Sequence, residues 1–176
     1  MRQLIMAAIA SAASLNTATA AEFTVSSPDI IDGVIAQAQY GAGGNISPAL
    51  EWSGAPEGTK SFVISIYDKD APTGSGFWHW VVVNVPGDAT SIPEGAGTDG
   101  STLPEGAIQT FNDASFNGYA GIAPPEGETH DYVITVKALG VDNLEVAPNA
   151  TGAMVGFVSN MSGLLGAATL VAKGGK

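Results

Sequence analysis

The chain contains no cysteine, few basic residues and no apolar run long enough to span a bilayer. Without cysteine, the core has to be stable without disulfides, and thiol nucleophiles and thiolate metal sites are excluded. Lysine and arginine number 6 against 17 aspartates and glutamates, which gives a formal net charge of −11. Nucleic acid is therefore excluded as a partner, because no basic stripe can displace counterions from phosphates, and anionic membrane surfaces are disfavoured.

Residues 1–20 have the pattern of a secretory signal peptide. Arg2 supplies a positive start, residues 4–15 form a short apolar run, and Ala18-Thr19-Ala20 resembles a cleavage signal. The run is too short to cross a bilayer. We therefore predict that residues 1–20 are removed, with cleavage after Ala21 as the alternative. The remaining residues 21–176 are then a single domain of an exported protein, periplasmic or secreted.

Glycine and proline are frequent and evenly spread, which is typical of many short strands joined by turns. The clearest strand is predicted over residues 61–67, which are β-branched and aromatic. Further strands are predicted over residues 23–25, 78–85, 131–138 and 169–172, and residues 86–106 are predicted to be irregular. The sequence therefore predicts one mainly β domain with a minor helical part.

One helix is predicted, from Gly152 to Leu165, with Thr151 as its N-cap. The apolar residues that recur at helical spacing are Met154, Val155, Phe157, Val158, Met161 and Leu165. Glycines inside this segment weaken the helical tendency.

Two carboxylates, Asp68 and Asp70, stand where the clearest strand ends, and Pro72 then forces a turn. Carboxylates at such a place accept hydrogen bonds, bind a cation or orient a histidine. A hydrated Asx-type turn is the ordinary structural alternative.

The two histidines both border strands next to loops that contain proline or glycine. His79 lies between Trp78 and Trp80, and regular alternation would turn it to the face opposite both tryptophans. A histidine in a central strand needs partners for its ring nitrogens, which are either backbone groups of the core or members of a site. His130 follows the stiff Pro124-Pro125 loop. We expect both histidines to share one site with the aspartate corner.

These motifs, in this order, resemble the phosphatidylethanolamine-binding proteins, also called the Raf-kinase-inhibitor-like family, in their bacterial exported branch. The resemblance covers nearly the whole chain after the signal peptide. It is carried by Asn45-Ile46-Ser47-Pro48-Ala49-Leu50-Glu51-Trp52, Tyr67-Asp68-Lys69-Asp70-Ala71-Pro72, Trp78-His79-Trp80, Asn112-Asp113, Gly118-Tyr119-Ala120-Gly121, Pro124-Pro125 and His130-Asp131-Tyr132.

The resemblance implies a β-rich fold of two antiparallel sheets with a few short helices. It also implies a small pocket for anionic groups such as phosphate, phosphonate or acetate. Carried over position by position, the ligand-binding residues would be Asp68, Asp70, His79, Ala123, Pro124, His130 and Tyr132. Histidine N–H and tyrosine O–H groups would donate to the ligand, and the carboxylates would raise the proton affinity of the histidines.

The resemblance implies a binder rather than an enzyme. Family members bind small ligands and inhibit or modulate partner proteins, so the expected partners are a small anionic or zwitterionic ligand and a protein. No cofactor, metal or catalytic residue is expected, and the oligomeric state stays open between monomer and homodimer. Two alternatives remain: a hydrolase with His79 and His130 as an acid–base pair, and a metal-dependent module in which Asp68 and Asp70 join the histidines.

Three residues depart from the family pattern. Lys69 replaces a proline and is expected to loosen the first corner. Asp131 replaces an arginine, which removes a cation beside the pocket and adds an anion, and Ala123 replaces a glycine or cysteine. We therefore expect weak anion binding, or a preference for a phosphoethanolamine-like zwitterion or an amine.

Overall fold

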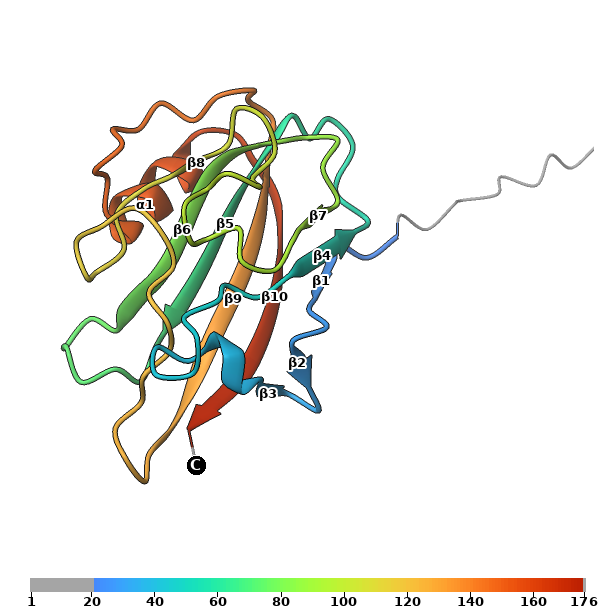
Figure 1. Ribbon diagram of the computed structural model, residues 1–176. Helices are drawn as coiled ribbons and strands as arrows, with labels where there is room; N and C mark the ends of the chain where they lie inside the picture. Colours follow the sequence, from blue (N-terminus) through green and yellow to red (C-terminus); the bar gives the residue numbers. More distant parts are fainter. Residues whose placement is uncertain (1–20, 176) are drawn as a thin grey trace, which may run out of the picture.

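Two β-sheets account for most of the regular structure in the computed structural model, which describes residues 21–175 (Figure 1). The predicted signal peptide, residues 1–20, lies outside the described residues. The large sheet has the order β2 (Ile30–Ile31), β3 (Val34–Ile35), β10 (Leu164–Gly175), β9 (Thr129–Leu139), β5 (Ser61–Asp68), β6 (Phe77–Pro86) and β8 (Ile108–Gln109). The small sheet has the order β1 (Thr24–Ser26), β4 (Leu50–Ser53) and β7 (Ser91–Ile92).

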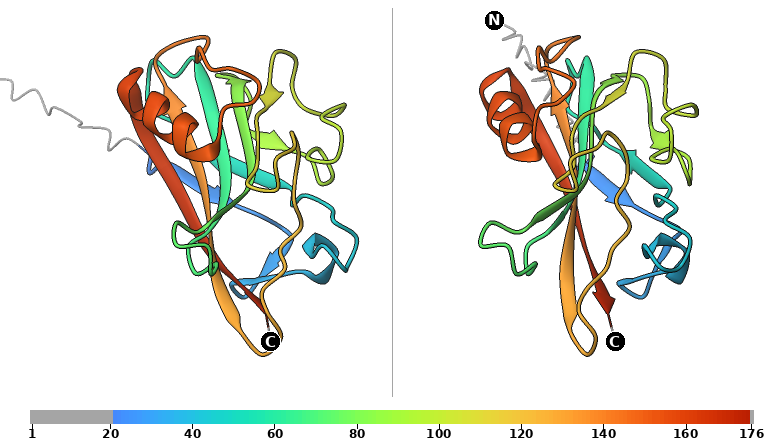
Figure 2. Two further views of the ribbon diagram at one scale, coloured as in Figure 1. Left: turned by 90° about the vertical axis from the view of Figure 1, so that its left-hand side faces the viewer. Right: turned by 60° about the vertical axis from the view of Figure 1, so that its left-hand side comes forward.

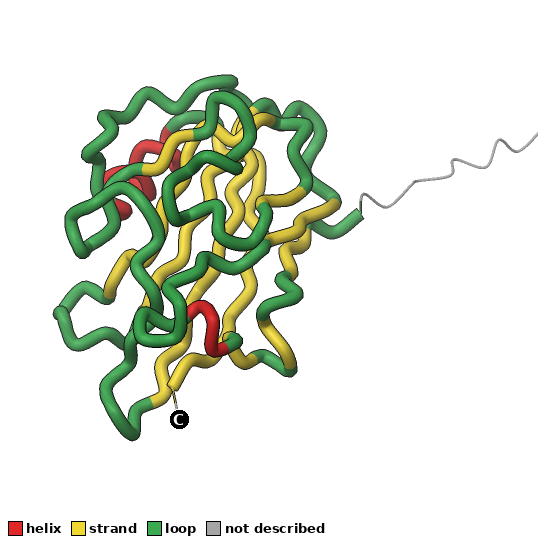
Figure 3. Tube along the Cα trace, in the orientation of Figure 1, coloured by secondary structure: helices red, strands yellow, loops and turns green. Residues whose placement is uncertain are grey.

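The expected fold class is confirmed: residues 21–175 are mainly β, with two sheets, one α-helix and one 3₁₀ turn, η1 (Gln37–Gln39). Every strand pair is antiparallel except β3 with β10. Long loops between β6 and β9 pass over one face of the large sheet (Figure 3). Within residues 21–175, no helix has the length and apolar character to cross a membrane.

The strands predicted at 61–67, 78–85 and 131–138 are confirmed as β5, β6 and β9, which lie side by side at the centre of the large sheet. The last strand was predicted too short, because β10 runs from Leu164 to Gly175 rather than over 169–172. Its alanines and glycines have low intrinsic β-propensity. They fit this position because Ala168 and Ala172 are buried against the core.

The core lies on both faces of the large sheet. Between the two sheets, Leu50 and Trp52 of β4 pack with Phe62 and Ile64 of β5. On the opposite face, Val63 and neighbouring valines of β6 pack under the helix α1 (Gly152–Met161). Figure 2 shows α1 on one side of the large sheet and the small sheet on the other.

A β-bulge in β6 changes the direction of His79. Tyr67 pairs with Trp78, whereas Ile66 pairs with Trp80, so His79 is an extra residue with no partner of its own. Trp78 then packs on the α1 side, and Trp80 packs between the sheets. The expectation that His79 faces away from both tryptophans was therefore wrong, since His79 lies on the same side as Trp80.

The helix begins where predicted, because the Thr151 hydroxyl accepts a hydrogen bond from the Met154 N–H at 3.3 Å. It ends at Met161 rather than at Leu165, since Gly163 takes a positive φ of 79° and Leu164 already starts β10. The predicted apolar face is only partly buried. Val155 is buried, but Met154, Phe157 and Met161 are 53%, 65% and 73% exposed.

The start of α1 lies so close to Trp78 that a Cβ at position 152 would overlap the indole ring. Gly152→Ala is therefore expected to lower the free energy of unfolding by about 1–3 kcal/mol. Gly156→Ala is the matched control, because nothing lies within 4 Å of a Cβ at that position. The control is expected to raise the free energy of unfolding by roughly 0.5–1 kcal/mol. Urea unfolding of both variants measures this, and equal effects would contradict the packing described.

Candidate functional site

A pocket of about 370 Å³ opens where the ends of β5, β6 and β9 meet two loops. Four of the seven predicted site residues lie on its wall: Asp68, His79, Ala123 and His130. The rest of the wall is mostly small or apolar and comprises Ala71, Pro72, Thr73, Phe77, Ala114, Ala120, Gly121 and Pro125. The two histidines and one aspartate of the sequence hypothesis are thus brought together, although their ligand-binding role remains a prediction.

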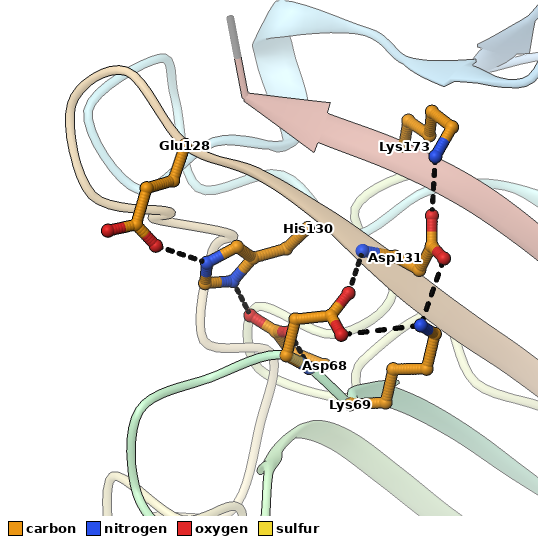
Figure 4. Close-up of polar contacts among 7 residues, drawn as sticks. Asp68, Lys69, Glu128, His130, Asp131 and Lys173 are labelled. Carbon is orange, nitrogen blue, oxygen red and sulfur yellow. Dashed lines mark hydrogen bonds and ion pairs between the residues drawn. The ribbon is translucent and has the colours of Figure 1, made fainter.

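A buried hydrogen bond joins the end of β5 to the start of β9. Asp68 is the last residue of β5 and pairs with Tyr132, so His130 lies two residues away on the same face of the sheet. The His130 Nδ1–H donates to Asp68 Oδ2 at 2.7 Å, and both side chains are 4% exposed. On the outer side of the ring, His130 Nε2 lies 3.2 Å from Glu128 Oε2 (Figure 4).

These two carboxylates raise the proton affinity of His130. The hydrogen bond to Asp68 raises the pKa of the imidazole, Glu128 adds to the effect, and burial opposes it. The expectation that carboxylates raise the proton affinity of the histidines is therefore correct for His130.

His79 has a different environment. Its Nδ1–H donates to the Ala120 carbonyl oxygen at 2.7 Å, and the side chain is buried. Burial lowers the pKa of His79, and this outweighs the opposing effects of the Ala120 carbonyl and the Asp68 charge. For His79 the expected rise in proton affinity was wrong, because its hydrogen-bond partner is a neutral carbonyl rather than a carboxylate.

Tyr132 lies behind the pocket rather than on its wall. Its ring centroid is 5.4 Å from that of His79 and 6.4 Å from that of His130. Within the described part of the chain, its buried hydroxyl has no hydrogen-bond partner, and burial raises its pKa. Pro124 also lies off the wall and instead lines a neighbouring hollow of about 480 Å³.

Asp70 belongs to a surface network beside the pocket. Its Oδ2 accepts a hydrogen bond from the Asp131 N–H at 2.8 Å, and its Oδ1 lies 3.3 Å from Lys69 Nζ. Asp131 in turn binds Lys69 at 3.0 Å and Lys173 at 2.9 Å (Figure 4). The lysine hydrogen bonds lower the pKa of Asp131.

This network bears on two of the departures from the family pattern. Asp131 adds an anion, as expected, and two lysines pair with it, at 3.0 and 2.9 Å. Lys69 lacks the fixed φ of the proline that it replaces. The turn is instead held by the Asp70 N–H, which donates to Asp68 Oδ1 at 2.9 Å. The two side chains that depart from the family pattern at positions 69 and 131 therefore pair with each other.

Sequence reasoning missed Glu128 and Phe77. Glu128 precedes His130 by two residues, the spacing that places side chains on one face of an extended chain, and this signal was available. Phe77 packs on the His79 ring with centroids 4.7 Å apart, a contact that the bulge creates. No group of three or more His, Cys, Asp or Glu side chains within residues 21–175 is arranged to hold a metal ion. The metal-dependent alternative therefore has no support from the residues present.

Comparison with known proteins agrees with this fold. The family model of the phosphatidylethanolamine-binding protein matches residues 25–173. UPF0098 protein YbhB of Escherichia coli K12 is 55% identical over 115 residues, which are 65% of this chain and 73% of YbhB. UPF0098 protein YbcL of the same organism is 52% identical over 120 residues, 67% of this chain and 66% of YbcL.

Two solved structures have the same fold. The crystal structure of Escherichia coli YbcL, a new member of the mammalian PEBP family, superposes with a TM-score of 0.84 at 42% identity and covers 89% of this chain and 99% of that chain. A PEBP homologue from Chlamydia trachomatis superposes with a TM-score of 0.76 at 25% identity, over 88% of this chain and 97% of that chain. Because the family model spans nearly all described residues, the chain belongs to the phosphatidylethanolamine-binding protein family.

Proposed function

We propose that this protein is an exported, non-catalytic binding protein whose pocket takes a small zwitterion of the phosphoethanolamine type. One observation carries the proposal: His130, whose pKa is raised, lies between two carboxylates at a pocket whose second histidine, His79, has a lowered pKa. The family name, given for binding of a lipid with this headgroup, supports a binding role. Modulation of a partner protein through the occupied pocket belongs to the same proposal.

The charge at the pocket favours an ammonium group. Asp68 and Glu128 place two carboxylates around the single imidazole of His130, whose pKa they raise, so the cluster is net negative whether or not His130 is protonated. His79 uses its Nδ1–H on Ala120, and its neutral ring therefore leaves Nε2 as an acceptor. A free phosphate dianion would be repelled by the same groups.

The phosphate end of the ligand needs donors, and the loops supply them. Ala114 and Ala123 line the pocket, and among the hydrogen bonds of residues 21–175 their backbone N–H groups donate to no acceptor. Backbone N–H groups bind phosphate oxygens well without adding charge. Phe77 and Pro72 give the wall an apolar part that suits the ethylene carbons.

Isothermal titration calorimetry tests the ligand class. Phosphoethanolamine is expected to bind at least about tenfold more tightly than inorganic phosphate or ethanolamine alone, because each fragment uses only one end of the pocket. Asp68→Asn is expected to weaken phosphoethanolamine binding by about tenfold or more. Asp70→Asn is the matched control, since Asp70 lies off the pocket wall, and its affinity is expected to equal that of the wild type.

Tight phosphate binding without preference for the amine would contradict the proposed ligand class. Equal losses in the Asp68 and Asp70 variants would place the ligand elsewhere. Turnover of chromogenic esters that His79→Ala abolishes would contradict the non-catalytic role.

Proton NMR tests the two histidines directly, since the chain has only 2. One imidazole is expected to titrate with a pKa above the ordinary 6.5 and the other below it. His130→Gln should remove the resonance with the higher midpoint. Two midpoints near 6.5, or loss of the lower one in this variant, would contradict the assignment.

The pKa shifts of His130 and His79 determine how the stability of the fold depends on pH. The raised pKa of His130 stabilises the fold fully below pH 6.5, and this contribution is lost as pH rises through the folded-state pKa. The lowered pKa of His79 acts in the opposite sense, because stability falls as pH drops from 6.5 through its folded-state value. The stability difference between wild type and His130→Gln is therefore expected to be larger at pH 6 than at pH 9, as urea unfolding at both pH values would measure.

Export rests on residues 1–20, with Arg2, the short apolar run and the Ala18-Thr19-Ala20 signal. When the full chain is made in a bacterial host, mass spectrometry of the periplasmic fraction is expected to find a chain that begins at Ala21 or Glu22. A full-length chain retained in the cytoplasm would contradict export.

A further inference from the structure

A second cavity, of about 120 Å³, lies between α1 and the large sheet, on the face opposite the small sheet (Figure 2). We call it the α1 cavity. Side chains of β5 and β9 form its floor, α1 forms its roof, and β6 closes one end. An apolar cavity of roughly 150 Å³ holds a molecule of the size of benzene. The α1 cavity is therefore of the right order of size for one small organic molecule.

Glycine in the roof leaves this space open. The α1 residues that line the cavity are Gly152, Val155, Gly156 and Ser159, the spacing of one helix face. Gly152 packs directly on Trp78, but a Cβ at position 156 would have nothing within 4 Å. Glycine inside a helix costs about 1 kcal/mol relative to alanine. Close packing does not require the glycine at position 156, and its effect is to keep the space above the sheet empty.

Lys137 of β9 is the one charged residue on the wall of the α1 cavity. Its Nζ donates to three neutral oxygens: Asn160 Oδ1 at 2.7 Å, Ser159 Oγ at 3.1 Å and the Gly156 carbonyl oxygen at 3.4 Å. No ion pair among residues 21–175 involves Lys137. Burial lowers the pKa of this ammonium group, and no carboxylate opposes the effect. The cavity therefore contains a half-buried cation without a counter-charge.

The charges around the α1 cavity decide which end an anion can occupy. No Asp or Glu lies in β6 or between Glu145 and Lys173, an uncharged segment that contains α1. The Asp113 carboxylate reaches the end formed by Trp78, where its Oδ2 accepts the Trp78 N–H at 2.9 Å. An anionic group is therefore favoured at the Lys137 end and disfavoured at the Trp78 end.

Between these ends the floor changes from polar to aromatic. Ser65 of β5 lies directly opposite Thr135 of β9, and both residues line the cavity next to Lys137. Their hydroxyl groups can donate to an anionic oxygen. Further along the strands, the rings of Tyr67 and Trp78 lie with centroids 4.6 Å apart. The cavity thus offers one cation and two hydroxyls at one end and apolar surface at the other.

We propose that the α1 cavity is a second ligand site, separate from the pocket at the strand ends, and that it takes a small organic monocarboxylate with a compact apolar ring. Lys137 binds the carboxylate in place of its 3.4 Å contact with the Gly156 carbonyl. That carbonyl also accepts the Ser159 hydroxyl at 3.0 Å, so it keeps a partner. The ring lies under Val155 and against Trp78.

The wall of the cavity favours this class over two others. A phosphate dianion would have one cation for two charges and would meet apolar walls, where an unpaired charge is costly. A neutral hydrocarbon would fit the apolar end but would leave Lys137 without a counter-charge. A monocarboxylate matches both the single cation and the apolar surface.

Isothermal titration calorimetry with sodium benzoate tests the ligand class. Benzoate is expected to bind at least about tenfold more tightly than benzyl alcohol, which has the ring without the charge. It is also expected to bind at least about tenfold more tightly than acetate, which has the charge without the ring. Nuclear Overhauser contacts between the benzoate ring protons and the Val155 methyl groups should locate the ligand under α1.

The role of the cation is tested by Lys137→Met, which keeps the length of the side chain and removes its charge. The dissociation constant for benzoate is expected to rise at least about tenfold. Lys60→Met is the matched control, because it removes the same charge from an exposed lysine that pairs with Asp142, and it should leave the constant unchanged.

The role of the empty space is tested by Gly156→Leu, whose side chain would fill the α1 cavity and abolish benzoate binding. Ala153→Leu is the matched control, since it adds similar bulk at an exposed position of the same helix, and it should leave binding unchanged. Thermal unfolding checks that all four variants fold. If Gly156→Leu does not fold, Lys137→Met and the wild-type contacts to Val155 decide.

Asp68→Asn separates the two sites, because it alters only the pocket at the strand ends and should leave the benzoate constant unchanged. Loss of benzoate binding in this variant, with binding kept in Gly156→Leu, would place the ligand in that pocket and overturn the proposal. A wild type that does not bind benzoate, or binds it no better than benzyl alcohol, would also overturn it. So would an unchanged affinity in Lys137→Met.

Discussion

The candidate site depends on one buried hydrogen bond, from His130 Nδ1–H to Asp68 Oδ2 at 2.7 Å. Both side chains are 4% exposed, and burying a carboxylate is costly unless a charged partner satisfies it. Asp68 also accepts the Asp70 N–H, so one carboxylate holds the turn after β5 and fixes the histidine at the start of β9. Loss of either partner would leave a buried group unpaired. The geometry of the pocket and the raised pKa of His130 therefore have a common cause.

The sequence predicts most of the central sheet and that the two histidines lie together at one site. It does not predict how the surroundings of the two histidines differ. β5, β6 and β9 are recognisable because their β-branched and aromatic residues favour strands intrinsically. β10 is not recognisable in this way, because its alanines are stabilised in the strand by close packing that no local sequence pattern reveals. The bulge at His79 is a property of the pairing between β5 and β6, and it decides that this ring is buried against the Ala120 carbonyl. Two similar sequence positions thereby acquire opposite pKa shifts.

Compensation between distant residues explains a second limit of sequence reasoning. Lys69 and Asp131 each appear to weaken the site when considered alone, since each replaces a residue typical of the family. In the fold they lie 3.0 Å apart, and Lys173 from β10 completes the neutralisation of Asp131. A cation and an anion have been introduced together and pair with each other, although the exchange of arginine for aspartate still makes the local charge more negative. Only the register that places β5 and β10 on either side of β9 makes this pairing evident.

Lys173 also links the surface network beside the pocket to the last strand of the large sheet. It binds Asp131 beside the pocket, and it is the first charged residue after the uncharged segment that begins beyond Glu145. On the pocket side of this boundary, charged groups are paired and hold the loop ends in place. On the other side, the backbone edge of β10 lacks both charge and a strand partner among the described residues. β3 pairs with β10 at Lys173, so the paired part of this outer edge begins at the same residue that binds Asp131 beside the pocket.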